Sequence, residues 1–135
     1  MKKIRFLTSL IIILVLVTAC APAAQEVVIL TVSDKGYTRT ALEALGTKSV
    51  DYTDKDGEIK TYDGVHLAAL LDDAGISGSS LTFTASDDYQ AELSTDEAMV
   101  CKNCIVAFDD DSLRLVMPDF SGKLQVKDLI SINAQ

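Results

Sequence analysis

The chain has 135 residues and a formal net charge of −8, with 12 basic and 20 acidic side chains. This length supports one modest domain, which can bury a usable core without a metal ion or a set of disulfides. The acidic balance argues against nucleic acid and anionic lipid headgroups as partners, because binding them needs clustered lysine and arginine.

The first twenty residues, MKKIRFLTSLIIILVLVTAC, have the layout of a secretory signal: basic residues, an apolar stretch, and small residues before Cys20. The apolar stretch from Leu10 to Val17 is too short for a lasting membrane span. The ending VTAC resembles the lipobox of bacterial lipoproteins, in which cleavage before the cysteine is coupled to attachment of diacylglycerol to its sulfur. The alternative is an ordinary signal peptide that is cleaved nearby.

From this resemblance we expect a lipoprotein signal peptide over residues 1–19, a lipidated Cys20 with a tether over residues 20–26, and one folded domain over residues 27–135. Two acyl chains bury enough methylene groups to hold a protein stably on a membrane, whereas one chain does not. We therefore expect a lipid-anchored protein on the extracytoplasmic face of the cell membrane. Its expected partners are the membrane and either a small ligand or a membrane or redox protein.

The first predicted elements of the domain are a strand and a short helix. Val27 to Val32 (VVILTV) is short and rich in β-branched residues, which suits a strand buried on both faces. In TALEALG, Thr40 and Glu43 have the spacing of a capping box, and Gly46 suits a left-handed helix end. This segment therefore predicts one or two helical turns.

A hairpin is predicted next. The segment KSVDYTDKDGEIKTY alternates on either side of Asp56-Gly57, the dipeptide best suited to a two-residue turn. Such a turn places Val50 and Tyr52 on the same face as Ile59 of the second strand.

The clearest helical pattern lies in GVHLAALLDDAG. Apolar residues recur there at i, i+3, i+4 and i+7, at Leu67, Leu70, Leu71 and Ala74. Gly75 follows at the position where a helix commonly ends. This segment predicts an amphipathic helix with one buried face.

The rest of the chain predicts mainly strands. LTFTASDDYQAELS reads as a second hairpin, and Ser94 with Glu97 forms another capping box that opens a short helix to about Val100. The strands IVAF and LRLVMP follow, separated by FDDDS, which lacks the ligand spacing of a calcium loop and predicts a solvated turn. LQVKDLISI closes the chain. We predict a single α+β domain with a mixed or mainly antiparallel sheet and two or three short helices.

Three segments together resemble the sulfite-oxidase-type oxidoreductase molybdopterin-binding domain. They are YDGVHLAALLDDAGI, LTFTASDDYQAELSTDEAM and LRLVMPDFSGKLQVKDLISI, which cover about residues 58–132. The resemblance depends on the order and spacing of the matched residues, and it implies the fold of that domain. The matched residues are Gly64, Val65, Leu67, Leu70, Leu71, Ala74, Gly75, Asp88, Tyr89, Arg114, Leu115, Val116, Pro118, Gly122, Lys123, Val126 and Lys127.

The chain departs from this family at the metal ligand. Catalytic members bind molybdenum through a cysteine thiolate before the first matched helix, but here no cysteine occurs between Ala21 and Val100. The family holds the phosphate of the pterin cofactor with basic residues, of which Lys123 and Lys127 match. Asp88 stands where the family commonly has glycine at a tight turn.

The pair Cys101 and Cys104 lies in MVCKNCIVAF. A redox-active thiol needs a depressed pKa, but this pair follows a short helix, whose C-terminal end is negative, and three aspartates lie close downstream. A zinc site would need two further ligands, for which His66 and an aspartate are the available candidates. Because oxidation is the default outside the cytoplasm, we predict a small disulfide, with two reduced thiols as the alternative.

We interpret the chain as a membrane-anchored lipoprotein that acts as a non-catalytic binding or redox-accessory module. We expect no catalytic residue and no metal site. We also expect no bound cofactor, and the family resemblance is the only feature that suggests molybdopterin. One alternative is an oxidoreductase, or a subunit of one, that binds molybdopterin or another cofactor. Another is a thiol–disulfide protein that uses Cys101 and Cys104. The resemblance implies a ligand-facing surface made of Tyr62, His66, Asp88, Tyr89, Phe120 and Lys123.

Overall fold

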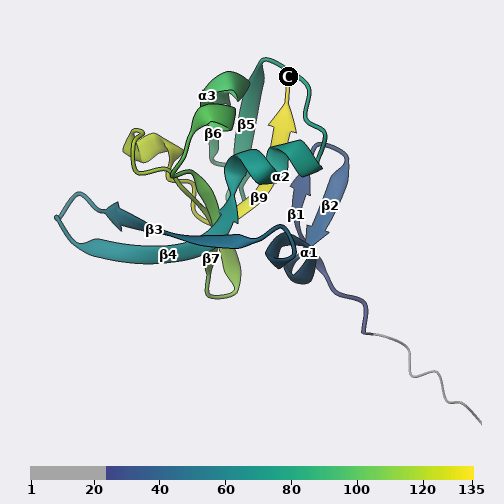
Figure 1. Cartoon of the computed structure of the whole chain (residues 1–135), viewed down its shortest axis with the longest axis horizontal. Helices are drawn as coiled ribbons and strands as arrows, with labels where there is room; N and C mark the ends of the chain where they lie inside the picture. The colour runs from purple at the N-terminus through teal and green to yellow at the C-terminus, as the bar shows by residue number, and fades with distance from the viewer. Residues whose placement is uncertain (1–23) are drawn as a thin grey trace, which may run out of the picture.

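The computed structural model describes residues 24–135. The expected signal peptide and Cys20 lie outside these residues. Within the described range, no helix is both long and apolar enough to cross a membrane. The described chain folds into two β-sheets against which short helices pack (Figure 1).

The first sheet has five strands in the order β2–β1–β9–β5–β6, and the second has four in the order β3–β4–β7–β8. The strands are β1 (Val28–Val32), β2 (Lys35–Thr38), β3 (Thr47–Thr53), β4 (Ile59–His66), β5 (Ser80–Ala85), β6 (Gln90–Ser94), β7 (Ile105–Asp109), β8 (Ser112–Val116) and β9 (Leu129–Ala134). The helices are α1 (Arg39–Glu43), α2 (Leu67–Asp73) and α3 (Thr95–Val100), with a 3₁₀ turn at Gly122–Leu124. Among the described strand pairs only β1 and β9 run parallel. The structure therefore confirms the predicted α+β domain.

The β3–β4 hairpin extends from the body of the domain at the left of Figure 1. Thr53 pairs with Ile59, so five residues form its loop instead of the predicted two. The carboxylate of Asp54 accepts hydrogen bonds from the backbone N–H groups of Asp56 and Glu58, both at 2.9 Å, and these bonds stabilise the longer loop.

The longer loop shifts the strand register by one residue relative to the prediction. Val50 lies opposite Tyr62, and Tyr52 lies opposite Lys60. A shift of one residue moves every side chain of a strand to the other face. Ile59 therefore lies on the face away from Val50 and Tyr52, and the predicted pairing was wrong.

Two further predictions near the start of the domain need correction. β1 is not fully buried on both faces, because Leu30 and Val32 are buried while Ile29 and Thr31, which alternate with them, are only half-buried. The N-cap of α1 is Thr38, not Thr40: the Thr38 side chain accepts a hydrogen bond from the N–H of Ala41 at 3.2 Å. Thr40 lies inside the helix.

The patterns in the middle of the chain were predicted correctly. Helix α2 buries Leu67, Leu70 and Leu71, and Gly75 follows it with a φ of 64°. Strands β5 and β6 pair as a hairpin. At α3, the N–H of Glu97 donates to the Ser94 hydroxyl at 3.2 Å, and that hydroxyl donates to the Glu97 carboxylate at 2.7 Å.

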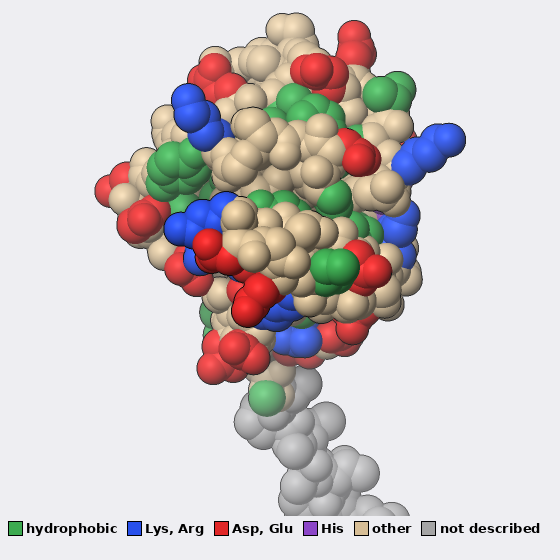
Figure 2. All heavy atoms as spheres, turned by 90° about the vertical axis from the view of Figure 1, so that its left-hand side faces the viewer, with side chains coloured by type: hydrophobic (Ala, Val, Ile, Leu, Met, Phe, Trp, Pro, Cys, Tyr) green, Lys and Arg blue, Asp and Glu red, His purple; other side chains and the backbone are tan. Residues whose placement is uncertain are grey.

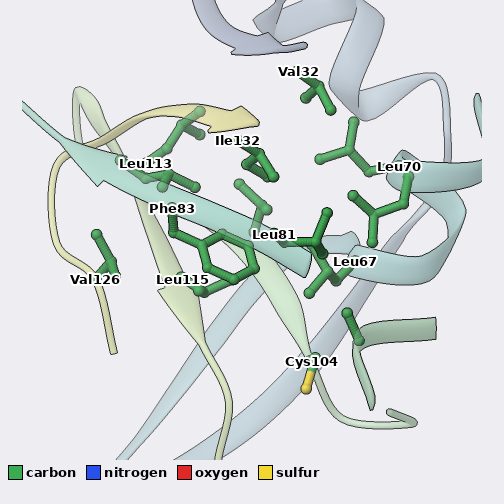
Figure 3. Packing of buried hydrophobic residues seen from close by; sticks show 14 of the residues in the cluster. Val32, Leu67, Leu70, Leu81, Phe83, Cys104, Leu113, Leu115, Val126 and Ile132 are labelled. Carbon is green, nitrogen blue, oxygen red and sulfur yellow. The ribbon is translucent and has the colours of Figure 1, made fainter. Parts of the chain in front are cut away.

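The main core lies between the two sheets and α2. In Figure 3, Leu67 and Leu70 of α2 point toward Leu81 of β5, and Phe83 lies beside Leu115 of β8. Full burial of side chains of this size contributes roughly 1.5–3 kcal/mol each. The central position of Leu67 and Leu70 explains why the apolar spacing of α2 was so clear in the sequence.

A smaller cluster covers the other face of the second sheet. It consists of Val50, Tyr62, Ile105, Ala107 and Val116, with Tyr52 packed against it. On β8, Leu113 and Leu115 belong to the main core, so Arg114 between them points to the face of this smaller cluster. The alternation of β8 thus places a basic side chain beside Tyr62.

Candidate functional site

Three of the six predicted ligand-facing residues lie together. The Tyr89 hydroxyl donates a 2.8 Å hydrogen bond to the carbonyl oxygen of Lys123, and both residues line a groove of about 410 Å³. Asp88 precedes Tyr89 in the β5–β6 turn and has a φ of 67°. This left-handed conformation favours glycine, which is common at this turn in the family that the chain resembles.

The other three predicted residues lie elsewhere. His66 precedes α2, and its Nε2 donates to the carbonyl oxygen of Cys101 at 2.8 Å. Phe120 is partly buried and packs against the main core. Tyr62 is 5% exposed and lines a different groove. The structure therefore does not gather the six residues into one surface, and their ligand-binding role stays a prediction.

The groove at Tyr62 is larger, about 650 Å³. It lies between the tip of the β3–β4 hairpin, from Tyr52 to Tyr62, and the segment from Gly122 to Lys127, with Arg114 between them. We call it the hairpin groove. Small-molecule sites in proteins commonly have volumes of 300–1,000 Å³, so the hairpin groove is of suitable size for one.

Arg114 forms the centre of a polar cluster in the hairpin groove. Its side chain is only 14% exposed, and its Nη1 donates to the Tyr62 hydroxyl at 3.0 Å. The same Nη1 lies 3.8 Å from Oδ2 of Asp109. Lys60 donates to Oδ1 of Asp109 at 3.4 Å, and its ammonium lies 4.6 Å from the centre of the Tyr62 ring. Asp109 therefore faces two cations at once.

The electrostatics of the hairpin groove differ from those of the whole chain. Four basic and three acidic side chains line it, in a chain whose net charge is −8. The hydrogen bond from Lys60 to Asp109, together with the nearby charge of Asp109, raises the pKa of Lys60 above its ordinary value. Figure 2 shows the side of the molecule to which the hairpin points, where basic and acidic side chains surround exposed hydrophobic ones.

Sequence reasoning missed most of this cluster. Arg114 was noted only as a match to a family motif, and Lys60 was not singled out. One local signal was available, because Lys60 and Tyr62 are two residues apart on a strand and so share a face. The sequence did not indicate that Arg114 contacts Tyr62, because the two residues lie on β8 and β4, which β7 separates in the sheet.

The second candidate region is the loop from Cys101 to Cys104. The two cysteines form a disulfide with a Cα–Cα distance of 5.6 Å, which supports the predicted pairing. Cys104 is fully buried and Cys101 is 8% exposed. The carbonyl oxygen of Lys102 accepts from Lys48, and that of Cys104 accepts from the N–H of Leu67 at 2.8 Å. The loop is thus held firmly against β3 and the start of α2.

The side chains of the described residues do not fit the metal centre that the family resemblance implies. The family's ligand is a thiolate, but both cysteine sulfurs within residues 24–135 belong to the disulfide. In the same range there is no group of three or more His, Cys, Asp or Glu side chains that could hold a metal ion. The three aspartates after Phe108 lie at the β7–β8 turn, where Asp109 pairs with Ser112.

Comparison with known proteins supports the fold. No family model matches the chain, and no curated protein matches it. Among solved structures, the chain is similar to the sulfane dehydrogenase SoxCD from Paracoccus pantotrophus, with a TM-score of 0.62 and 17% identity over 77% of this chain. The match spans only 37% of that protein's chain. At this level of identity the likeness shows the fold alone: the matched part of the chain adopts a molybdopterin-domain-like fold.

Proposed function

We propose that the chain is a lipid-anchored, extracytoplasmic binding module that uses a molybdopterin-domain-like fold without the family's metal centre. The observation that carries this proposal is the Cys101–Cys104 disulfide, because it removes both sulfurs of the folded domain from metal ligation. Cys104 is also fully buried, which argues against rapid exchange with an external thiol. The chain therefore has the fold of a cofactor-binding domain, but the two cysteine sulfurs of that domain form a structural disulfide.

The ligand of this module binds in the hairpin groove. This groove has the volume of a small-molecule site and presents a half-buried Tyr52, the Tyr62 hydroxyl and the Arg114 guanidinium. Ligand sites commonly contain a few precisely placed polar groups that fix the orientation of the ligand, and the Tyr62 hydroxyl and the Arg114 guanidinium are groups of this kind. The groove beside Tyr89 and Lys123 is smaller, and its defining hydrogen bond joins the two residues to each other.

The arrangement of the domain suits an anchor at Cys20. The Thr40 hydroxyl donates to the Glu26 carboxylate at 2.5 Å, which ties the start of the described chain to α1. In Figure 1 this end leaves the domain beside α1, at the opposite side of the view from the hairpin tip. A lipid on Cys20 would therefore leave the hairpin groove open to solvent.

Native mass spectrometry of the full-length chain, expressed with its own leader in a bacterium that makes molybdopterin and extracted in mild detergent, tests the proposal. We expect the mass of residues 20–135 with a diacylglyceryl group, less two hydrogens for the disulfide. A Cys20→Ser variant serves as the control and should lack the lipid mass.

Two outcomes would overturn this proposal. An additional mass that matches molybdopterin, haem or a metal would favour the oxidoreductase, the alternative that the structural likeness suggests at family level. A wild-type mass without the diacylglyceryl group would contradict the proposed lipid anchor. The thiol–disulfide alternative would gain support if the Cys101–Cys104 pair were reduced at potentials typical of disulfide oxidoreductases.

A further inference from the structure

The guanidinium of Arg114 has fewer partners than its burial requires. Arginine carries five N–H donors, yet within the described residues Arg114 makes one hydrogen bond, from Nη1 to the Tyr62 hydroxyl. Its Nε is buried and has no partner in that range. The nearest carboxylate oxygen, of Asp109, lies 3.8 Å from Nη1, beyond hydrogen-bond length. Buried polar groups are normally satisfied, so this guanidinium retains donors for a further acceptor.

The charges around Arg114 favour an anion. Lys60 and Lys127 line the same groove, and the side chain of Lys60 is 62% exposed. Asp109 is the carboxylate in contact with the cluster, and Lys60 and Arg114 share it. The Asp54 carboxylate accepts hydrogen bonds from backbone N–H groups of its own loop. The remaining acidic side chains of the groove, Asp56 and Glu58, lie in that loop and are exposed.

The volume and the other walls of the groove indicate an organic ligand. A bare inorganic anion would leave most of a groove of about 650 Å³ unfilled. The ring of Tyr52 is half-buried and lines the groove beside Lys60 and Tyr62. Covering such apolar surface is favourable, and it requires a ligand with an apolar body.

We propose that the hairpin groove binds a small organic acid. Its carboxylate, sulfonate or phosphate accepts charge-assisted hydrogen bonds from Arg114 and Lys60, and its apolar body lies against the ring of Tyr52. This inference rests on the proposed function and assigns the class of ligand to the same groove. It requires no metal and no redox step.

The test is an NMR titration of the ¹⁵N-labelled, lipid-anchored chain in zwitterionic detergent micelles. The probes are benzoate, benzenesulfonate and phenyl phosphate, with benzamide as the neutral control. We expect saturable shifts of the Arg114 Nε–Hε signal and of the Gly122 amide with at least one acid, and none with benzamide. The order of the three affinities identifies the acid group. The inference is overturned if no acid gives saturable shifts, or if benzamide binds equally well.

Matched variants show whether the named cations carry the binding. Arg114→Gln and Lys60→Gln should each weaken binding of the best probe about tenfold, since each removes a charge-assisted hydrogen bond. Arg39→Gln is the control, because Arg39 lies on α1 and pairs with Glu43 at 2.9 Å. Lys60 is exposed, so its variant reports on binding even if Arg114→Gln does not fold. Equal losses in the Arg39 and Lys60 variants would contradict the assignment.

The failure of this inference can be told apart from the failure of the proposed function. A lipidated, cofactor-free mass together with no acid binding rejects the organic acid and leaves the binding module in place. A bound redox cofactor in the mass spectrum rejects the proposed function itself.

Discussion

The hydroxyl of Tyr37 donates a 2.7 Å hydrogen bond to Oδ2 of Asp73 and thereby ties β2 to the end of α2. Lys35 donates to the same carboxylate oxygen at 2.6 Å. Tyr37 is 2% exposed, whereas Lys35 and Asp73 lie at the surface. The three side chains connect the edge strand of the first sheet to the helix that fills the core.

Removing the Tyr37 hydroxyl should destabilise the domain. We expect Tyr37→Phe to lower the free energy of unfolding by about 1 kcal/mol, because the ring stays buried and only the hydrogen bond is lost. Urea denaturation followed by circular dichroism measures the change. Tyr52→Phe is the control, since within residues 24–135 the Tyr52 hydroxyl has no hydrogen bond to another side chain or to the backbone. Equal effects of both variants would show that the Asp73 contact contributes nothing.

The stability should depend on the ionisation of Asp73. Hydrogen bonds from Lys35 and then Tyr37 hold the pKa of Asp73 below its ordinary value. A carboxylate with a lowered folded-state pKa stabilises the fold above its unfolded pKa, about 3.9, and this contribution is lost as pH falls through the folded value. Wild type should therefore exceed Asp73→Asn in stability at pH 6 and approach it at pH 2. A difference that stays constant between these pH values would contradict this.

Gly64 should not tolerate a side chain. A Cβ at this position would lie 2.2 Å from the carbonyl oxygen of Val106, so the β4 and β7 backbones would have to separate. We expect Gly64→Ala to cost about 3 kcal/mol or more, or to prevent folding. Gly122→Ala is the matched control, because a Cβ there meets nothing within 4 Å. Thermal denaturation of both variants should show a large loss for the first and a change of about 0.5 kcal/mol or less for the second.

The cap of α1 can be located by two alanine variants. Thr38→Ala should lower the free energy of unfolding by about 1 kcal/mol, because it removes the acceptor for the Ala41 N–H. Thr40→Ala removes no cap and should have a smaller effect. A larger loss for Thr40→Ala, measured by chemical denaturation, would restore the assignment that the sequence alone suggested.

Reduction of the Cys101–Cys104 disulfide should weaken the domain without unfolding it. The cysteines are three positions apart, so the bond closes a short loop and restricts the unfolded chain only modestly, by about 2 kcal/mol. Denaturation curves of the oxidised protein and of protein kept in excess phosphine reductant give the difference. Complete unfolding on reduction at 25 °C would mean that the loop contacts to His66, Lys48 and Leu67 depend on the disulfide far more than its length suggests.

Short-range patterns predicted the structure correctly where no neighbouring side chain offered an alternative hydrogen bond. The spacing of Leu67, Leu70 and Leu71 determines one helical face, and Ser94 with Glu97 forms a cap within four residues, so both were predicted correctly. The β3–β4 register was wrong because it depends on the carboxylate of Asp54, which captures two backbone N–H groups and lengthens the loop. The dipeptide Asp56-Gly57 does not reveal that competition.

The amino-acid sequence by itself determined the class of the domain, the main helix, the second hairpin and the pairing of two nearby cysteines. The helix and the hairpin follow from interactions between residues close together in the chain, and the two cysteines are only three positions apart. The residues that line the hairpin groove are brought together only by the tertiary structure. Arg114 and Tyr62 are 52 positions apart, and they meet because β7 pairs with both of their strands. Strand order arises from burial of the whole core, which no local pattern records.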